Sequence, residues 1–183
     1  MTGPSGAGKG TLIKALLERR NDLAVAVSAT TRPVRPGEVD GREYYFLSDG
    51  EFQRRVEAGD FLEWVEYVSD RYGTLRSEVD RILAGGRSCV LELETQGALV
   101  VKNKVPDAVT IFVTAPLSEL ERRLRERATE SAGEIDERLA VARRQLEQAG
   151  EFDYVVENDD LERAVSDLAE IVDREVVGTL RRT

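Results

Sequence analysis

The residues best suited to chemistry stand at the start of the chain, in a glycine-rich segment that runs directly into a helical pattern. Glycines at this density let successive backbone N–H groups point inward and form a nest for phosphate oxygens. A helix that follows at once adds its positive N-terminus, and a lysine there can reach the β- and γ-phosphates of a nucleoside triphosphate. The pattern therefore predicts a phosphate-binding loop over residues 3–10. Its nucleotide contacts are expected from Gly3, Pro4, Ser5, Gly6, Ala7, Gly8, Lys9, Gly10 and Thr11.

Two features of this loop depart from its usual form. Gly10 stands where the pattern has a Ser or Thr whose hydroxyl contacts Mg²⁺, so Thr11 or a water molecule is the expected replacement. Such a loop also normally follows a buried strand, but only Met1 and Thr2 precede it here. We expect the first core strand to be missing and stability to be lower, because each buried apolar side chain contributes about 1.5–3 kcal/mol.

A second group of polar residues follows in the first half of the chain. Arg32 and Arg35 lie in a proline-containing loop, where two guanidinium groups can hold a phosphate dianion through charge-assisted hydrogen bonds. Tyr44 and Tyr72 can add phenolic donors. Arginines on a solvated loop are the simpler interpretation of the same residues, so the motifs around them matter.

Several separated motifs occur in order along the chain, and through them the sequence resembles the guanylate kinases over essentially its whole length. The resemblance implies transfer of the γ-phosphoryl group of ATP to GMP, and also to dGMP, with Mg²⁺ as cofactor. It places the reaction in purine nucleotide metabolism, where it recycles GMP to GDP. The motifs are Ser28-x-Thr30-Thr31-Arg32-x-x-Arg35-x-Gly37-Glu38, Tyr44-x-Phe46, Phe61-Leu62-Glu63-Trp64, Tyr72-Gly73-Thr74 and Gln96-Gly97-Ala98.

The resemblance also implies which residues recognise the acceptor base. A carboxylate at Glu63 can accept from both donors on one edge of guanine, whereas adenine presents an unprotonated nitrogen there, and such sites discriminate by about 10⁴-fold or more. Ser28 and Thr74 match the hydroxyls that assist in the family. Glu38 matches an acceptor-site residue, and Glu94, where the family usually has Asp, is assigned to the acceptor base or to Mg²⁺-bound water.

A charged region in the second half of the chain matches the family's lid over residues 123–138. Its arginines, Arg123, Arg127 and Arg138, correspond to those that contact the transferring phosphoryl group, and with Lys9 they are the expected catalytic residues. A solvated charged face is the alternative interpretation of such alternating charges. Asn158 matches a residue near the donor adenine, although an Asn in a turn before a helix fits equally well.

Two other functions stay open at this point. One is a different phosphotransferase with the same loop, acting on AMP, UMP or a non-nucleotide acceptor. The other is a binding module, because scaffold proteins contain guanylate kinase-like domains that recognise phosphopeptides. Those modules typically lack the loop and lid residues, whereas Lys9 and the three arginines are present here.

Composition limits the remaining possibilities. The chain has 183 residues, 41% of them hydrophobic, which suits one domain with one core. A net charge of −9 disfavours nucleic acid as a partner, and the absence of His excludes triad hydrolases and HExxH metalloenzymes. The single cysteine, Cys89, permits no intrachain disulfide and is expected to be a buried strand thiol. Without an apolar run or a signal peptide, a cytoplasmic protein is expected, as a monomer or a homo-oligomer.

The elements that must position these residues alternate between strand-like runs and amphipathic helices. This order predicts one α/β domain over residues 1–183, a three-layer P-loop NTPase fold with a parallel core sheet, a small GMP-binding subdomain over residues 28–86 and a lid. Ser48 with Glu51, and Ser118 with Glu121, form capping boxes that start two helices, the first ending at Gly59. Further helices are expected over 134–149 and from Leu161. Strands are expected at 23–28, 44–47, 61–67, 89–94, 109–114 and 154–157.

Overall fold

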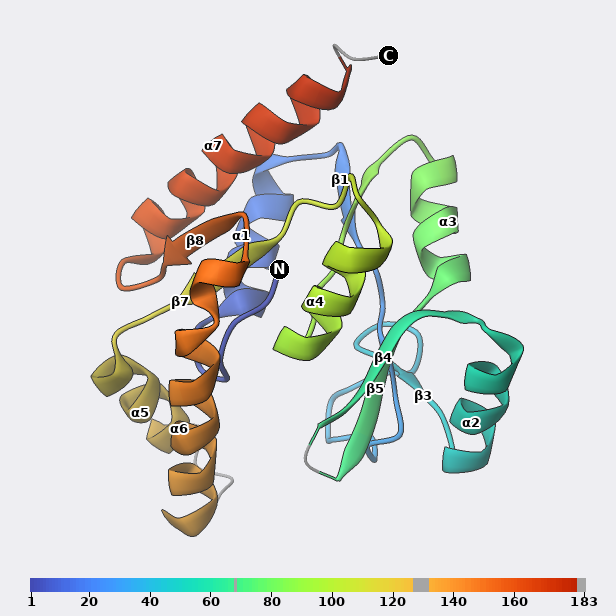
Figure 1. The fold of residues 1–183 in the computed structure, drawn as a ribbon, viewed down its shortest axis with the longest axis horizontal. Coiled ribbons are helices and arrows are strands. Elements are labelled where there is room, and N and C mark those ends of the chain that lie inside the picture. Colours follow the sequence, from blue (N-terminus) through green and yellow to red (C-terminus); the bar gives the residue numbers. More distant parts are fainter. Residues whose placement is uncertain (68, 127–131, 181–183) are drawn as a thin grey trace. The chain divides into compact units, whose positions relative to one another are not determined.

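The computed structural model describes residues 1–67, 69–126 and 132–180. The chain divides into two compact units, which can be followed by colour in Figure 1. The loop unit consists of Met1–Arg20 and Asp107–Thr183, and the hairpin unit consists of Asn21–Pro106. In the described parts of the chain, no helix combines the length and the apolar character that crossing a membrane requires.

The loop unit is built from two parallel strands and helices from both ends of the chain. Strand β7 pairs with β8, with Ile111 opposite Tyr154, and α7 contacts both β8 and α1. Helix α5 packs against α6 through Leu124, Ile135 and Leu139. The elements are α1 (Lys9–Arg19), β7 (Ile111–Thr114), α5 (Leu117–Glu126), α6 (Ala132–Glu147), the 3₁₀ turn η1 (Ala149–Glu151), β8 (Tyr154–Glu157) and α7 (Leu161–Leu180).

The glycine-rich loop begins from a residue that is itself paired with this sheet. Thr2 is fully buried and forms one parallel bridge to Phe112. Its N–H donates to the carbonyl of Ile111 at 2.9 Å, and its carbonyl accepts from Val113 N–H at 2.7 Å. Such a loop normally follows a buried strand, but in this structure a single bridge takes the place of that strand.

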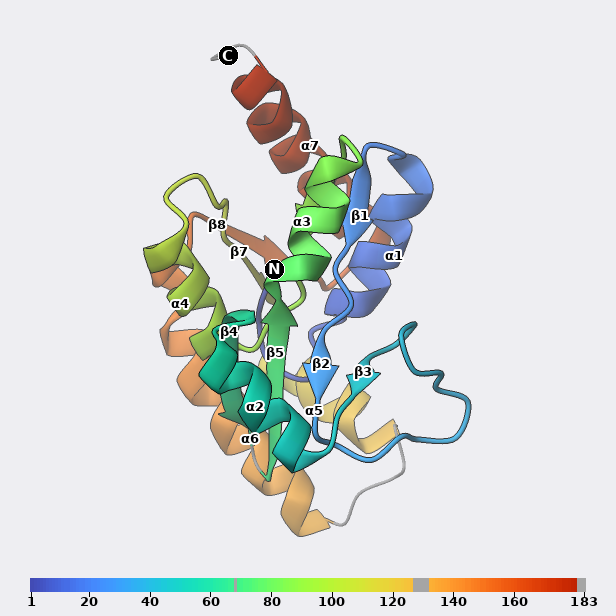
Figure 2. The same cartoon turned by 90° about the vertical axis from the view of Figure 1, so that its right-hand side faces the viewer.

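The hairpin unit contains a two-stranded parallel sheet, β1 with β6, and a four-stranded sheet in the order β3-β2-β5-β4. Figure 2 shows α2 lying over the hairpin of β4 and β5. That contact is made by Phe52 of α2, which stacks on Phe61 of β4 with the ring centroids 4.5 Å apart. The elements are β1 (Leu23–Val25), β2 (Ala29–Thr30), β3 (Tyr45–Phe46), α2 (Asp49–Ala58), β4 (Phe61–Tyr67), β5 (Asp70–Leu75), α3 (Arg76–Ala84), β6 (Ser88–Val90) and α4 (Thr95–Lys104).

The observed strands agree in part with those predicted. The strands at 61–67 and 154–157 have the predicted bounds, whereas β1 and β6 stop three and four residues early. Strand β5 was not predicted. The parallel strands β1–β6 and β7–β8 form separate two-stranded sheets, so the three-layer arrangement around one parallel core sheet stays a prediction.

The helix signals were also correct in part. Ser48 Oγ accepts from the N–H of Glu51 at 3.2 Å, and Gly59 ends α2 in the left-handed conformation, as predicted. The second capping box is wrong, because α5 begins at Leu117 and Ser118 lies inside its first turn. The carbonyl of Pro116 accepts the first helical hydrogen bond there, from Leu120 N–H at 3.0 Å.

Candidate active site

The glycine-rich loop leads into α1 at a single left-handed residue. Gly8 is the N-cap of α1, with φ of 85°, a conformation that costs glycine little. A Cβ at this position would lie 2.4 Å from Nδ2 of Asn158, so the loop also needs the space. The N-terminus of an 11-residue helix is thereby set against the loop, which is a ready-made site for an anion.

Lys9 lies across its own loop. Its Nζ donates to the carbonyl of Gly3 at 2.7 Å and to that of Pro4 at 3.3 Å. The ammonium group therefore sits over the loop backbone, where the sequence pattern places the phosphates. Phosphate oxygens can take the place of these two carbonyl acceptors.

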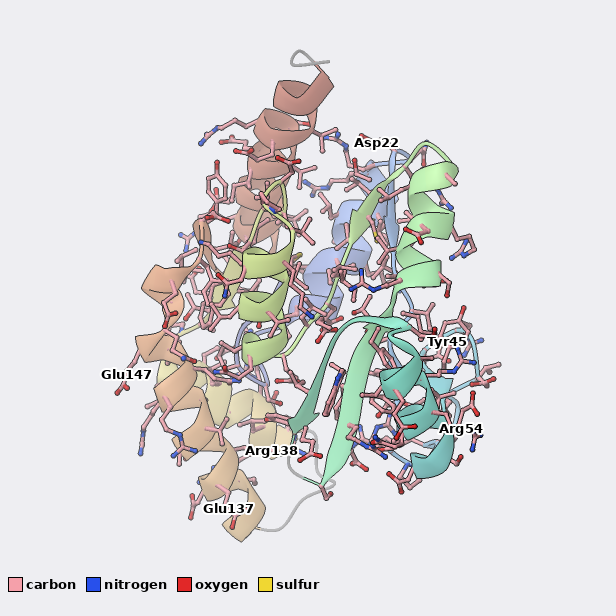
Figure 3. The ribbon with its side chains drawn as sticks, turned by 45° about the vertical axis from the view of Figure 1, so that its right-hand side comes forward. Asp22, Tyr45, Arg54, Glu137, Arg138 and Glu147 are labelled. Atoms are coloured by element: carbon pink, nitrogen blue, oxygen red, sulfur yellow. The ribbon has the colours of Figure 1, made fainter. Side chains whose placement is uncertain are left out.

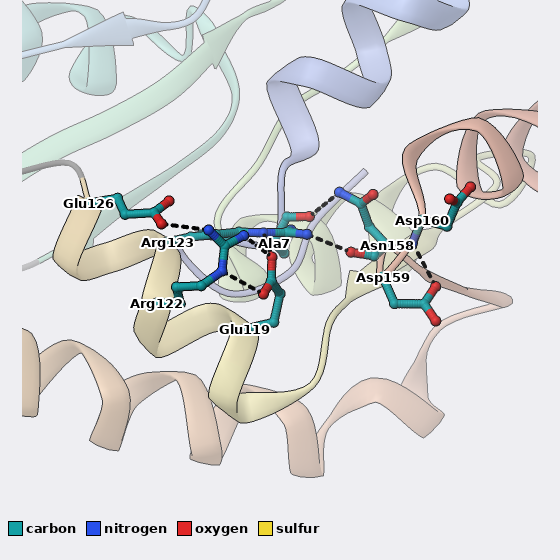
Figure 4. A network of polar contacts seen from close by, with 9 residues as sticks. Ala7, Glu119, Arg122, Arg123, Glu126, Asn158, Asp159 and Asp160 are labelled. Atoms are coloured by element: carbon teal, nitrogen blue, oxygen red, sulfur yellow. Dashed lines mark hydrogen bonds and ion pairs between the residues drawn. The ribbon is translucent and has the colours of Figure 1, made fainter.

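Asn158 connects the end of β8 to the loop, as Figure 4 shows. Its side chain is buried, with 4% of its surface exposed, and its Nδ2 donates to the carbonyl of Ala7 at 2.8 Å. Its backbone N–H donates to the carbonyl of Thr114 at 2.7 Å. Asn158 thus braces the loop from inside, a role that the sequence did not predict, while its contact with adenine stays a prediction.

Replacing Asn158 by Ala tests this brace. The buried carbonyl of Ala7 would lose its donor, which costs about 1–3 kcal/mol of unfolding free energy, and the Kd for ATP is expected to rise about tenfold. Chemical denaturation and ATP titration measure both. Asp159→Ala is the control, because it removes two exposed contacts, the pair with Arg163 and the hydrogen bond from the N–H of Asp160, and should cost less than about 1 kcal/mol. Equal stability of the two variants would contradict the brace.

Arg123 is the predicted lid residue that the structure places against the loop. Its Nη1 donates to the carbonyl of Gly6 at 3.3 Å and its Nη2 to that of Asn158 at 2.9 Å, while Nε pairs with Glu119 at 2.7 Å (Figure 4). Hydrogen bonds from Arg122 and Arg123 lower the pKa of Glu119 to about 2. Arg123 is therefore held at the loop beside an ionised Glu119.

The structure says less about the positions of the other arginines in the expected lid region. Arg138 is half-buried on α6, where Figure 3 labels it between Glu137 and Glu147. Arg127 lies outside the described residues, as do residues 128–131 of the expected lid. Arg122 and Arg125 are more than half exposed and pair with acids on their own helix, as a solvated face would.

In the hairpin unit, the predicted phosphate-binding residues form one cluster around Arg32. The side chain of Arg32 is 9% exposed, and its Nη2 donates to both carboxylate oxygens of Glu38, at 2.8 and 3.1 Å. It also lies over the ring of Tyr44, 5.3 Å from the centroid, and Tyr44 meets Tyr72 edge to face. Arg35 is exposed, and its backbone N–H donates to Glu38 at 2.8 Å.

Charge and burial keep this cluster in defined protonation states. The hydrogen bond from Arg32 is the main cause that lowers the pKa of Glu38, which stays ionised. Burial, together with the negative charge of Glu92, raises the pKa of Tyr44 to about 12, so its hydroxyl remains a donor. Burial first, and then the negative charge of Asp70, raise the pKa of Tyr72, and the charge of Glu94 makes a smaller contribution in the same direction.

The predicted base-reading residues meet across the hairpin. Glu63 lies opposite Thr74 in the register of β4 and β5. Both side chains are buried, and Thr74 Oγ1 donates to Oε1 of Glu63 at 2.8 Å. Burial raises the pKa of Glu63, an effect that the hydrogen bond from Thr74 and the charge of Lys104 oppose. Ser28, the third predicted residue, is half-buried, and its carbonyl accepts from Tyr45 N–H at 2.9 Å.

The sequence analysis did not predict two residues that lie next to Glu63 in the structure. Gly97 lies directly against the carboxylate of Glu63, and Lys104 Nζ donates to the carbonyl of Leu62 at 3.3 Å. Both belong to α4, seven positions apart, which places them on the same face of the helix. The sequence offered a signal for both residues: Gly97 lies in the family motif Gln96-Gly97-Ala98, and Lys104 follows it at helical spacing.

The donor atoms around the loop do not build a magnesium site. Gly10 has no side chain, and Thr11 is exposed in the first turn of α1. Among the residues that the structure describes, no three acidic, His or Cys side chains group so as to hold a metal ion. Thr11 as a ligand stays a prediction, and a nucleotide that carries Mg²⁺ on its own phosphates fits these residues better.

Comparison with known proteins gives consistent matches. The family model described as guanylate kinase matches residues 1–175. Guanylate kinase of Rubrobacter xylanophilus is 52% identical over 97% of this chain and 94% of that protein, and that of Symbiobacterium thermophilum is 46% identical over 99% and 86%. Among solved structures, guanylate kinase from Anaplasma phagocytophilum aligns with a TM-score of 0.78 and 30% identity, covering 95% of this chain and 84% of that one.

Proposed function

The chain belongs to the guanylate kinase family, with a mixed α/β P-loop nucleoside monophosphate kinase fold, and we propose that it transfers the γ-phosphoryl group of ATP to GMP. The single observation that carries the choice of GMP is the buried carboxylate of Glu63, hydrogen-bonded by Thr74. A buried carboxylate fits the two adjacent donors of the guanine edge. Against adenine it would face a lone pair while removed from water, which is a costly arrangement.

The cluster around Arg32 suits the phosphate of GMP. Arg32 and Arg35 supply the positive charge, and Tyr44 and Tyr72 supply hydroxyl donors. The hydrogen bonds from Nη2 to both oxygens of Glu38 hold the guanidinium of Arg32 in place before a ligand arrives. Pre-organisation of this kind lowers the entropic cost of binding.

On the donor side, the loop of residues 3–10 binds the phosphates of ATP, and Lys9 moves from the carbonyls of Gly3 and Pro4 to the phosphate oxygens. An oxygen of the GMP phosphate then attacks the γ-phosphorus, and the bond to the β,γ-bridging oxygen breaks to release ADP. A phosphate oxygen needs no base to activate it, so the absence of His does not hinder the step. Positioning and neutralisation of charge provide the rate enhancement.

The lid arginines complete the proposed site. Arg123, already at the loop, together with Arg127 and Arg138, neutralises the equatorial oxygens of the transferring group, while Asn158 contacts the adenine as well as the loop. Mg²⁺ carried by the phosphates of ATP would offset part of their negative charge. We propose residues 28–86 as the GMP-binding region and residues 123–138 as the lid, in a cytoplasmic enzyme without nucleic-acid or membrane partners.

A coupled assay of ADP release with GMP, dGMP, AMP and UMP as acceptors tests the function. We expect turnover with GMP and dGMP, and a kcat/KM for AMP and UMP lower by about 10⁴-fold. Equal turnover with AMP and GMP would refute the assignment of the base site. Binding of GMP without turnover in the presence of ATP and Mg²⁺ would instead favour a binding module.

A further inference from the structure

Gly97 lies where the acceptor carboxylate meets helix α4. Glu94 is the N-cap of α4, so Gly97 is the third helical residue, and it is buried. A Cβ added to Gly97 would lie 2.5 Å from Oε2 of Glu63 and 3.3 Å from its Cδ. A Cβ essentially never comes within 3.0 Å of another heavy atom, so only glycine leaves the carboxylate where it is.

The other side of the same carboxylate is held by a hydrogen bond. Thr74 Oγ1 donates to Oε1 at 2.8 Å, which leaves Oε2 as the oxygen that faces Gly97. The carboxylate is therefore enclosed between a strand and a helix. Its orientation depends on Thr74 for one oxygen and on the missing Cβ of Gly97 for the other.

The surrounding backbone has little freedom to relieve a contact at this point. Helix α4 packs along β4, and Lys104 in its last turn donates to the carbonyl of Leu62 at 3.3 Å. Strand β4 is in turn paired with β5 at Glu63 and Thr74. The part that can yield is the end of the Glu63 side chain, because it moves by rotation of side-chain bonds alone.

We infer that Gly97 is a positioning residue that determines specificity: it sets the place of the Glu63 carboxylate and thereby the preference for guanine. The inference rests on the proposed role of Glu63 in reading the base. It predicts that adding one methyl group at residue 97 changes the choice of acceptor without unfolding the protein.

The test is Gly97→Ala, assayed with GMP and AMP. Gly97 has no left-handed φ and lies in a helix, where alanine is the more favourable residue, so the fold is expected to hold. The KM for GMP should rise about 10²-fold, as for a displacement of about 1 Å in a catalytic site. The GMP-to-AMP ratio of kcat/KM should fall by a similar factor, while the KM for ATP and the thermal unfolding midpoint stay unchanged.

Gly50→Ala is the matched control, since Gly50 lies in the first turn of α2 in the same unit. A Cβ there would meet its nearest neighbour, Nη1 of Arg54, at 3.7 Å, which is an ordinary contact. This variant should keep the KM for GMP and the base preference of the wild type. A rise in KM as large as that of Gly97→Ala would show a general effect of helix substitution and overturn the inference.

Glu63→Ala, alone and combined with Gly97→Ala, separates the inference from the function on which it rests. We expect Glu63→Ala to abolish the base preference and the second substitution to add no further loss, because the displaced group is gone. If Glu63→Ala keeps the preference for GMP, the proposed acceptor role is wrong. If Glu63→Ala loses it while Gly97→Ala retains it, or if Gly97→Ala weakens GMP and AMP equally, Gly97 does not set specificity.

Discussion

Lys9→Ala is expected to lower kcat by about 10³-fold or more while the Kd for GMP changes less than threefold. The Nζ of Lys9 bonds to carbonyls of its own loop, so its charge lies where the β- and γ-phosphates are proposed to bind. As negative charge shifts toward the leaving oxygen during transfer, loss of this cation raises the barrier. Single-turnover kinetics and GMP titration by calorimetry measure the two quantities.

Lys14→Ala provides the control for this result. Lys14 is an exposed lysine of the same helix, so its removal changes the net charge equally and leaves the loop intact. It should keep kcat within about twofold, as expected for a surface substitution. A Lys9→Ala variant that binds GMP and still turns over within tenfold of the wild type would refute the catalytic role of Lys9.

Glu63→Gln should reduce kcat/KM for GMP by about 10⁴-fold and leave the low value for AMP nearly unchanged. Glutamine keeps the volume and an oxygen that can accept from Thr74, but its amide group turns a donor toward a guanine edge that also donates. Measuring kcat/KM for both acceptors tests this. A loss of the same size for AMP would point to a structural effect in place of base reading.

The stability of Glu63→Gln gives an independent control, because the direction of its change with pH follows from the pKa shift of Glu63. Burial raises the pKa of Glu63 above its ordinary value of 4.5, so the ionised carboxylate is less favourable in the folded chain than in the unfolded one. The stability that Glu63 contributes is therefore present below pH 4.5 and lost as the pH rises through the folded pKa. At pH 7 the unfolding temperature of Glu63→Gln should therefore equal or exceed that of the wild type. The difference between the two unfolding temperatures should shrink as the pH falls toward 4.

Much of the site could be predicted because its signals are local. The glycine-rich loop, Lys9 and the start of the helix after them lie within a dozen residues. Over so short a stretch, residues that are close in the sequence are also close in the fold. The same holds for the cap at Ser48. The prediction at Ser118 failed because Pro116 supplies the first helical acceptor, and β5 was missed because Gly73 and polar residues interrupt its alternation of apolar side chains.

The sequence by itself determined the glycine-rich loop, the family motifs and the residue types of both candidate sites. These features could be read from it because they depend on residues that are neighbours along the chain. Only the tertiary structure decided which of those residues meet. Asn158 reaches Ala7 across 151 positions, and Glu63 reaches Thr74 through the register of a hairpin. Gly97 shows its role only when a helix packs on a strand, since contacts between distant segments follow from packing and not from spacing along the chain.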